Sequence, residues 1–217
     1  EMIKINNLHH SYDNIKVLDG INLEINKSEI ISVLGKSGAG KTTLLNLIGT
    51  LDTIQDGEIF INGKLVNNLS LKELYKLRNE EIGFVFQFHN LLPEFTALEN
   101  ICLPAFIKGI TKKEAEKKAY ELLKKLDLTN RAQHKPNQLS GGEKQKISIC
   151  RALINSPSFV LADEPTGNLD SHNTEIIYKL FQKLNNEFGH TFVIITHNNN
   201  FARIGNKKVL MQDGKII

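Results

Sequence analysis

The chain has 217 residues, of which 41% are hydrophobic and 24% charged, and its formal net charge is +3. This composition is typical of a soluble globular protein large enough to bury a core. Only four of the 27 basic residues are arginines, and no basic block is rich in aromatic residues, so we expect no nucleic-acid partner. No apolar run approaches the roughly 20 residues of a membrane span, and no apolar signal segment opens the chain. The two cysteines lack the spacing of a metal site. We therefore expect a soluble, cytosolic domain.

The first 30 residues are predicted to be β-structure. Alternating apolar residues predict strands at 3–8 and 17–25. Tyr12 lies between them, in the polar stretch 9–14. An exposed aromatic in a loop can stack on a base, and the alternative is a side chain that packs against its neighbours. From its surroundings alone, Tyr12 fits the packing role better.

A short apolar run at 30–34 predicts a buried strand, and the pattern G-x-x-x-x-G-K-[ST] of a phosphate-binding loop follows it. Glycines let the backbone turn sharply, and the next helix would direct its free N–H groups toward an anion. Lys41 would supply charge to the β- and γ-phosphates, and the Thr42 hydroxyl can ligate Mg²⁺. A chance match has odds of about one in a hundred. The predicted nucleotide-binding residues are Gly35, Lys36, Ser37, Gly38, Ala39, Gly40, Lys41, Thr42 and Thr43.

The middle of the chain changes from mixed to helical character. Between residues 50 and 87 the pattern predicts a strand at 57–63, a helix at 71–78 opened by a capping box from Ser70, and a strand at 82–87. Residues 88–156 are predicted to be helical. A second capping box, Thr111 to Glu114, opens a helix with one apolar stripe. The stripe consists of Ala115, Ala119, Leu122 and Leu126.

The last 60 residues return to alternating strands and helices. Predicted in order are a buried strand at 159–164, a helix at 173–188 ended by Gly189, a buried strand at 191–197, and a hairpin around Asp213-Gly214.

Three of these strands end in polar side chains. In a parallel sheet the carboxyl ends of strands share one edge, where ligands bind, and the phosphate loop follows a strand in the same way. We expect Asp163 to hold Mg²⁺ and Glu164 to act as the general base for water. His197 would sense or stabilise the γ-phosphate, and Gln87 would ligate Mg²⁺ or orient water. The alternatives are a solvated turn before Pro165 and a plain polar cap at His197.

One further stretch, Ser140 to Glu143, fits a capping box and can be read simply as a helix start. Gly141 and Gly142 in the first turn are poor for helix stability, which favours a site where something approaches the backbone closely. A helix N-terminus with free N–H groups and a serine hydroxyl is a second anion site.

With these residues placed, the chain resembles the ATP-binding subunits of ABC transporters over essentially its whole length. The motifs are the Walker A loop at 35–42, the Q-loop Gln87, the signature Leu139 to Glu143, Walker B at 159–163 with Glu164, the D-loop 168–170 and the switch His197. The resemblance implies ATP and Mg²⁺ as ligands. It also implies an α/β P-loop NTPase (RecA-like) fold, with a mostly parallel sheet flanked by helices, an N-terminal antiparallel β-subdomain and a helical insert. Residues 1–87 and 157–217 would form the core of this single domain, and 88–156 the helical subdomain.

The same resemblance implies how the chain works. Two copies would enclose two ATP molecules head to tail, with Ser140 and the Gly141–Gly142 backbone of one copy on the γ-phosphate held by the other. Tyr12 matches the aromatic that stacks on adenine, which reverses its first interpretation. Glu143 stands where many members have glutamine. The dimer would drive a membrane permease from the cytoplasmic face of the inner membrane, and the segment after Gln87 would contact that permease.

Within the family, residues 86–100 and 163–170 look like those of the lipoprotein-release ATPases. Macrolide-efflux and cell-division relatives share the second stretch and much of the first. Three alternatives therefore stay open: the motor of a macrolide or peptide exporter, a regulatory ATPase that transports nothing, and an ATPase without a membrane partner.

Overall fold

The computed structural model describes residues 1–197 and 205–217, whose strands form two sheets. The smaller sheet is antiparallel and has the order β2-β1-β4-β5. Its strands are β1 (Ile3–Tyr12), β2 (Ile15–Ile25), β4 (Asp56–Ile61) and β5 (Lys64–Leu65). The predicted antiparallel structure at the N-terminus is therefore confirmed.

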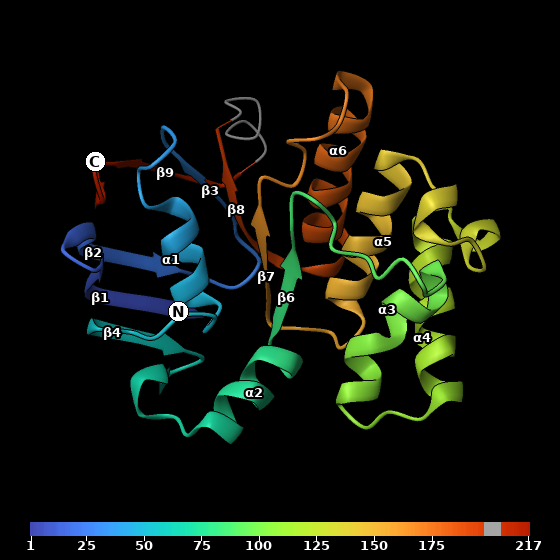
Figure 1. The fold of residues 1–217 in the computed structure, drawn as a ribbon, viewed down its shortest axis with the longest axis horizontal. Helices are drawn as coiled ribbons and strands as arrows, with labels where there is room; N and C mark the ends of the chain where they lie inside the picture. The colour runs from blue at the N-terminus through green and yellow to red at the C-terminus, as the bar shows by residue number, and fades with distance from the viewer. Residues whose placement is uncertain (198–204) are drawn as a thin grey trace.

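The larger sheet has the order β10-β9-β3-β8-β7-β6 and is parallel except for the β9–β10 hairpin. Its strands are β3 (Ile30–Leu34), β6 (Ile82–Val85), β7 (Phe159–Asp163), β8 (Thr191–Thr196), β9 (Lys207–Gln212) and β10 (Lys215–Ile216). Figure 1 shows β6 and β7 side by side with their arrowheads toward one edge. This sheet confirms the predicted mostly parallel arrangement.

The helices occupy both faces of the parallel sheet. They are α1 (Lys41–Ile48), α2 (Leu71–Glu80), α3 (Ala97–Ile107), α4 (Lys112–Lys125), α5 (Gly141–Leu153) and α6 (Ser171–Phe188), with short 3₁₀ turns η1 (Val66–Asn68), η2 (Thr129–Arg131) and η3 (Pro136–Gln138). In the described part of the chain, no helix is both long and apolar enough to cross a membrane.

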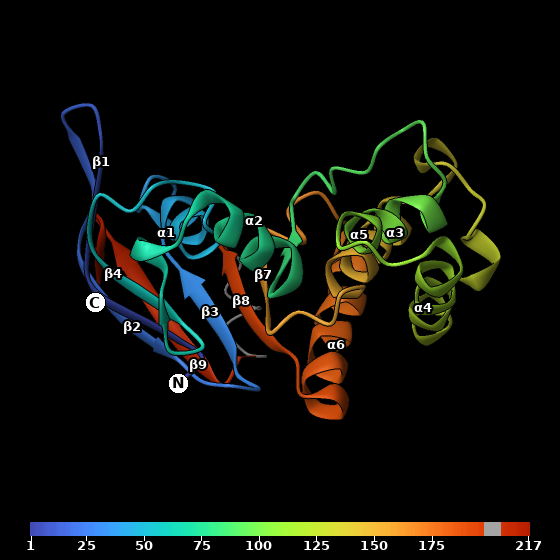
Figure 2. The ribbon, with the colours of Figure 1, turned by 90° about the horizontal axis from the view of Figure 1, so that it is seen from below.

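Alternating side chains of the central strands build two separate cores. Phe159 and Leu161 of β7 pack with α1 and the antiparallel sheet, whereas Val160 and Ala162 pack with α3 to α6. Side chains of a strand point alternately to opposite faces of the sheet. A strand that is buried on both faces therefore contributes apolar side chains to both cores. Helix α1 thus lies between the two sheets, and Figure 2 shows α3, α4 and α5 together on the other side of the molecule.

Several predicted boundaries were wrong. Tyr12 is the last residue of β1 and not a loop residue, because β1 stays paired with β2 up to the Tyr12–Ile15 pair. Strand β6 ends at Val85, two residues before Gln87. Residues 88–96 contain no helix, and α3 begins only at Ala97.

Two details of the helices also differ from prediction. In the capping box predicted at Thr111, the Glu114 backbone N–H donates to the Thr111 hydroxyl oxygen as expected. The Glu114 carboxylate, however, accepts from the Thr111 hydroxyl and not from the Thr111 backbone N–H, so the second bond of the box is missing. Helix α6 begins at Ser171 with Asp170 as its cap, two residues earlier than predicted. The proposed division into a core and a helical subdomain at 88–156 stays a prediction.

Candidate nucleotide-binding site

A cleft of about 660 Å³ lies at the carboxyl edge of the parallel sheet, and we call it the nucleotide cleft. The ends of β3, β6, β7 and β8 bring Lys41, Gln87, Asp163 and His197 to this one cleft, and Tyr12 reaches it from β1. Adjacent parallel strands with matched register end at the same level, which explains why residues up to 156 positions apart in sequence meet there.

The backbone of the phosphate loop is shaped by close contacts with other strands. A Cβ on Gly35 would lie 2.4 Å from the Met211 carbonyl oxygen, and one on Gly40 would lie 2.8 Å from that of Val17. Gly40 also has a φ of 92°, in the region that favours glycine. The loop is therefore clamped between β9 and β2, and this fixes the direction in which α1 starts.

Lys41 is buried and bonded to its own loop. Its Nζ donates to the carbonyl oxygens of Gly35 at 2.8 Å and Lys36 at 2.9 Å. Of the other predicted loop residues, those that line the cleft are Ser37, Gly38, Gly40, Thr42 and Thr43, whereas Gly35, Lys36 and Ala39 do not. A lysine ammonium has three N–H donors, so one is left for a phosphate beside the two carbonyl bonds.

Thr42 and Asp163 form the strongest candidate for holding a metal. The Thr42 hydroxyl donates to the Asp163 carboxylate at 3.4 Å. Burial and the neighbouring Glu164 raise the pKa of Asp163. A carboxylate and a hydroxyl are hard oxygen ligands, and a cation would relieve the cost of burying the charge, so the pair fits Mg²⁺.

Gln87 lines the cleft, but its amide does not contact this pair. Its Nε2 donates to Asn168 Oδ1 at 3.4 Å, and Asn168 Nδ2 donates back to the Gln87 carbonyl oxygen at 3.2 Å. The side chain lies against Gly167, where a Cβ would come within 2.7 Å of Nε2. The structure thus ties Gln87 to the turn after β7, and the sequence pattern did not indicate this contact.

Glu164 and His197 bind each other directly. Glu164 Oε1 lies 2.8 Å from His197 Nδ1 and accepts the His197 backbone N–H at 2.9 Å, while Oε2 accepts the Thr196 hydroxyl at 3.1 Å. Glu164 has a φ of 44°, and its N–H donates to the Ile195 carbonyl oxygen. The base candidate and the γ-phosphate sensor candidate therefore form one unit at the ends of β7 and β8.

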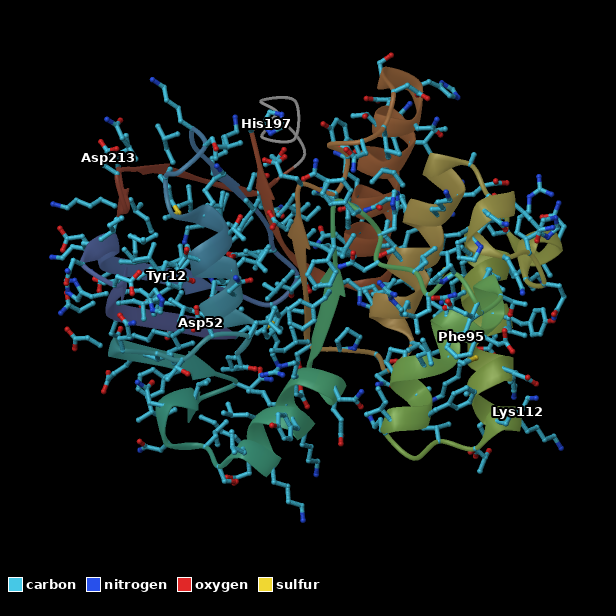
Figure 3. All side chains as sticks on the ribbon, viewed as in Figure 1. Tyr12, Asp52, Phe95, Lys112, His197 and Asp213 are labelled. Carbon is cyan, nitrogen blue, oxygen red and sulfur yellow. The ribbon has the colours of Figure 1, made fainter. Side chains whose placement is uncertain are left out.

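Tyr12 is held in place by a hydrogen bond from its own hydroxyl. That hydroxyl donates to Asp52 Oδ2 at 2.7 Å, and the two side chains lie side by side in Figure 3. The ring of His10 meets the Tyr12 ring edge-on at 4.7 Å. The phenol bond lowers the pKa of Asp52. With 45% of its surface exposed, the Tyr12 ring is available to a flat ligand in the cleft.

The signature turn, which we define as Ser140–Glu143, lies outside the nucleotide cleft. Its capping box is complete: Ser140 Oγ accepts the Glu143 N–H at 3.2 Å, and Glu143 Oε2 accepts the Ser140 N–H at 2.8 Å. A Cβ on Gly142 would lie 2.3 Å from Asn173 Oδ1 of α6. A side chain of the same chain therefore accounts for the close approach at Gly142, whereas Ser140 and Gly141 are exposed.

Sequence reasoning missed two arginines around this region. Arg131 Nε donates to Glu143 Oε1 at 2.7 Å. Near the other end of α5, Arg151 donates to the carbonyl oxygens of His89 at 2.7 Å and Asn90 at 2.6 Å. His89 and Asn90 both have positive φ, so the guanidinium stabilises a sharp turn just after Gln87.

Comparisons with known proteins place this arrangement in a family. The family model described as "ABC transporter" matches residues 18–167, more than half of the chain. The chain belongs to the ABC transporter family. Two relatives named lipoprotein-releasing system ATP-binding protein LolD, from Bacteroides thetaiotaomicron and Bacteroides fragilis, are each 54% identical, covering at least 99% of both chains.

Solved structures of ABC transporter cassettes have the same fold. The dimeric structure of MJ0796 is 45% identical with a TM-score of 0.90, covering 99% of this chain and 96% of that one. A second MJ0796 structure, described as a post-hydrolysis state bound to ADP and Pi, is 44% identical with the same TM-score. The predictions of an ABC transporter ATPase and of ATP as its nucleotide are confirmed. The cleft contains residues of the predicted Walker A loop, and the predicted signature residues lie outside it.

Proposed function

We propose that this chain is the ATP-hydrolysing subunit of a transporter that releases lipoproteins from the inner membrane. The observation that carries the proposal is the 54% identity, over 99% of both chains, to a relative named for lipoprotein release. The matched span includes the loop 86–100, the part of the chain whose sequence resembles the lipoprotein-release ATPases. No observation favours the efflux or cell-division alternatives over this one.

In this proposal the nucleotide cleft binds one ATP. The phosphate loop and Lys41 hold the β- and γ-phosphates, and the exposed Tyr12 ring stacks on adenine. Thr42 and Asp163 hold Mg²⁺, which supplies charge neutralisation at the phosphates when bound. Gln87 would join this set only after its amide leaves Asn168.

Glu164 is proposed as the general base for the attacking water. Its carboxylate is bonded to His197 and Thr196, which hold it at the edge of the cleft. His197 is exposed on its other side, so it can contact a γ-phosphate while it keeps Glu164 in place. Proton transfer to a positioned carboxylate contributes about 10²–10⁴-fold to a rate.

Two copies would complete each site head to tail. The signature turn exposes Ser140 and Gly141 but faces no phosphate of its own chain, because it lies outside the cleft. The dimeric MJ0796 structure, similar over 99% of this chain, supports such a pairing. Ser140 and the Gly141–Gly142 backbone would then contact the γ-phosphate held by the partner copy, and Glu143 would shape the turn that presents them.

A membrane permease would bind at an apolar groove of about 560 Å³ between α2, α3 and the end of α5. Phe86, directly before Gln87, and Asn90, three residues after it, line the groove, and Phe88 between them in sequence is 73% exposed. Exposed aromatic side chains beside an apolar groove are typical of a protein-binding surface. A permease there would hold the chain at the cytoplasmic face of the membrane.

The proposal is tested by purifying the chain with its membrane partner and reconstituting both in proteoliposomes that contain a lipoprotein. ATP should release the lipoprotein to a soluble acceptor, and a Glu164→Gln complex should not. ATP-driven export of a macrolide or peptide without lipoprotein release would contradict the assignment, and so would purification without any membrane protein.

A further inference from the structure

Arg131 stands directly behind the signature turn, and no function has been assigned to it so far. It is the last residue of η2, and its Nε donates to Glu143 Oε1 at 2.7 Å. The other carboxylate oxygen, Oε2, accepts the Ser140 N–H at 2.8 Å. Each oxygen of Glu143 therefore has one charge-assisted partner, and the carboxylate is fixed from both sides.

The carboxylate at Glu143 creates an electrostatic problem for the proposed dimer. The signature turn would meet a triphosphate, and an acidic side chain in the first helical turn repels that charge. The side chains of Glu143 and Arg131 are 23% and 38% exposed, so water does not fully screen either of them. A glutamine at this position would need no counter-charge, whereas a glutamate does.

We propose that Arg131 is a positioning residue for ATP hydrolysis, which neutralises Glu143 and holds its carboxylate on the Ser140 N–H so that the signature turn can receive the partner's γ-phosphate. This inference rests on the proposed head-to-tail dimer. It assigns Arg131 no contact with ATP: the residue acts through Glu143. Its effect should therefore depend on whether a carboxylate is present at position 143.

The test is a double-mutant cycle with Arg131→Gln, Glu143→Gln and the double variant, each measured for kcat and KM in ATP hydrolysis. We expect Arg131→Gln to lower kcat by about tenfold, the usual effect of losing a hydrogen bond between charged groups. Nucleotide affinity of the separated subunit should change by less than about twofold, since its own Walker A loop binds the nucleotide. In the Glu143→Gln background, adding Arg131→Gln should change kcat by less than about twofold.

Two further variants separate charge from packing. Lys135→Gln removes an exposed positive charge four residues away and should leave kcat unchanged. Arg131→Lys keeps the charge and should retain at least about half of the wild-type kcat. If Arg131→Gln fails to fold, as circular dichroism would show, Arg131→Lys and its Glu143→Gln double variant still test the proposal.

Equal loss of kcat on removing Arg131 with either residue at position 143 would overturn the inference, and so would unchanged kcat in Arg131→Gln. If the proposed head-to-tail dimer does not form, the results would differ from those above. In that case Glu164→Gln would form no ATP-dependent dimer in sedimentation, and wild-type hydrolysis would not rise with protein concentration. A normal dimer without coupling between Arg131 and Glu143 would disprove this inference alone.

Discussion

The nucleotide cleft and the signature turn differ in how their polar groups are satisfied before ATP arrives. In the cleft, Lys41 Nζ donates to carbonyl oxygens of its own loop, and Glu164 Oε1 lies 2.8 Å from His197 Nδ1. At the signature turn, Ser140 and Glu143 bond each other, and Arg131 completes the set. A triphosphate in the cleft would compete with these partners of Lys41, whereas the bonds of the signature turn lie within the turn and to Arg131. Changes in the cleft should therefore affect chemistry and affinity, and changes at the signature turn should affect pairing.

The largest expected effect is on the chemical step. Glu164→Gln should lower kcat by about 10²–10⁴-fold while ATP still binds, because the amide keeps the shape but cannot accept a proton. Stopped-flow phosphate release and sedimentation would measure it, and the variant should accumulate as an ATP-bound dimer. Near-normal hydrolysis would show that Glu164 is not the base.

The next effect is on nucleotide affinity. Lys41→Ala should weaken ATP binding by about 100-fold, since two charge-assisted bonds to phosphate are lost. Isothermal titration measures this directly. Lys36→Ala is a matched control in the same loop, where only the backbone carbonyl binds Lys41, so its affinity should fall much less. Unchanged affinity in Lys41→Ala would contradict the assigned role of the loop.

Mixing two inactive variants, one changed in the cleft and one in the signature turn, distinguishes the two regions most directly. The expected change in activity is smaller than in the experiments above. Ser140→Arg and Lys41→Ala should each be inactive alone. A mixture should recover about a quarter of wild-type activity, because half of the pairs are mixed and each mixed pair has one complete site. No recovery on mixing would mean that each chain hydrolyses ATP without its partner's signature turn.

The smallest effect concerns the ring at the edge of the cleft. Asp52→Ala should weaken ATP binding by about threefold, because the Tyr12 ring loses the bond that orients it for stacking. Fluorescence titration with a labelled ATP measures this, with Glu121→Ala on the exposed side of α4 as a control for charge. An effect as large as that of Tyr12→Ala would mean that Asp52 acts on more than the ring.

The parts of the site that could be predicted are those encoded by neighbouring residues. The phosphate loop, the polar residues after buried strands and the Ser140 capping box each depend on a few consecutive positions. The bonds of Gln87 to Asn168 and of Glu143 to Arg131 join residues 81 and 12 positions apart, which no local pattern indicates. The positive φ of Glu164 could not be predicted from sequence either, because it depends on the hydrogen bond from its backbone N–H to Ile195 of the neighbouring strand β8.

One signal of these contacts was present in the composition. The chain uses lysine for most of its basic residues, and only four are arginine. Three of the four bind defined partners: Arg78 the Thr50 carbonyl oxygen, Arg131 the Glu143 carboxylate and Arg151 two carbonyl oxygens. The fourth, Arg203, lies outside the described residues. Arginine has a planar fork of donors that lysine lacks, so in a lysine-rich chain it marks positions where geometry matters.

Arg151 also has a mechanical consequence. Helix α5 begins at the signature turn, and Arg151 is its eleventh residue, about 15 Å along the helix axis from Gly141. The guanidinium bonds the backbone at His89 and Asn90, beside the apolar groove. An α-helix does not shorten or stretch easily, because every turn is hydrogen-bonded. A displacement of the backbone at 89–90 that keeps these two bonds would therefore shift α5 as a unit. The signature turn at the start of α5 would then move together with the apolar groove.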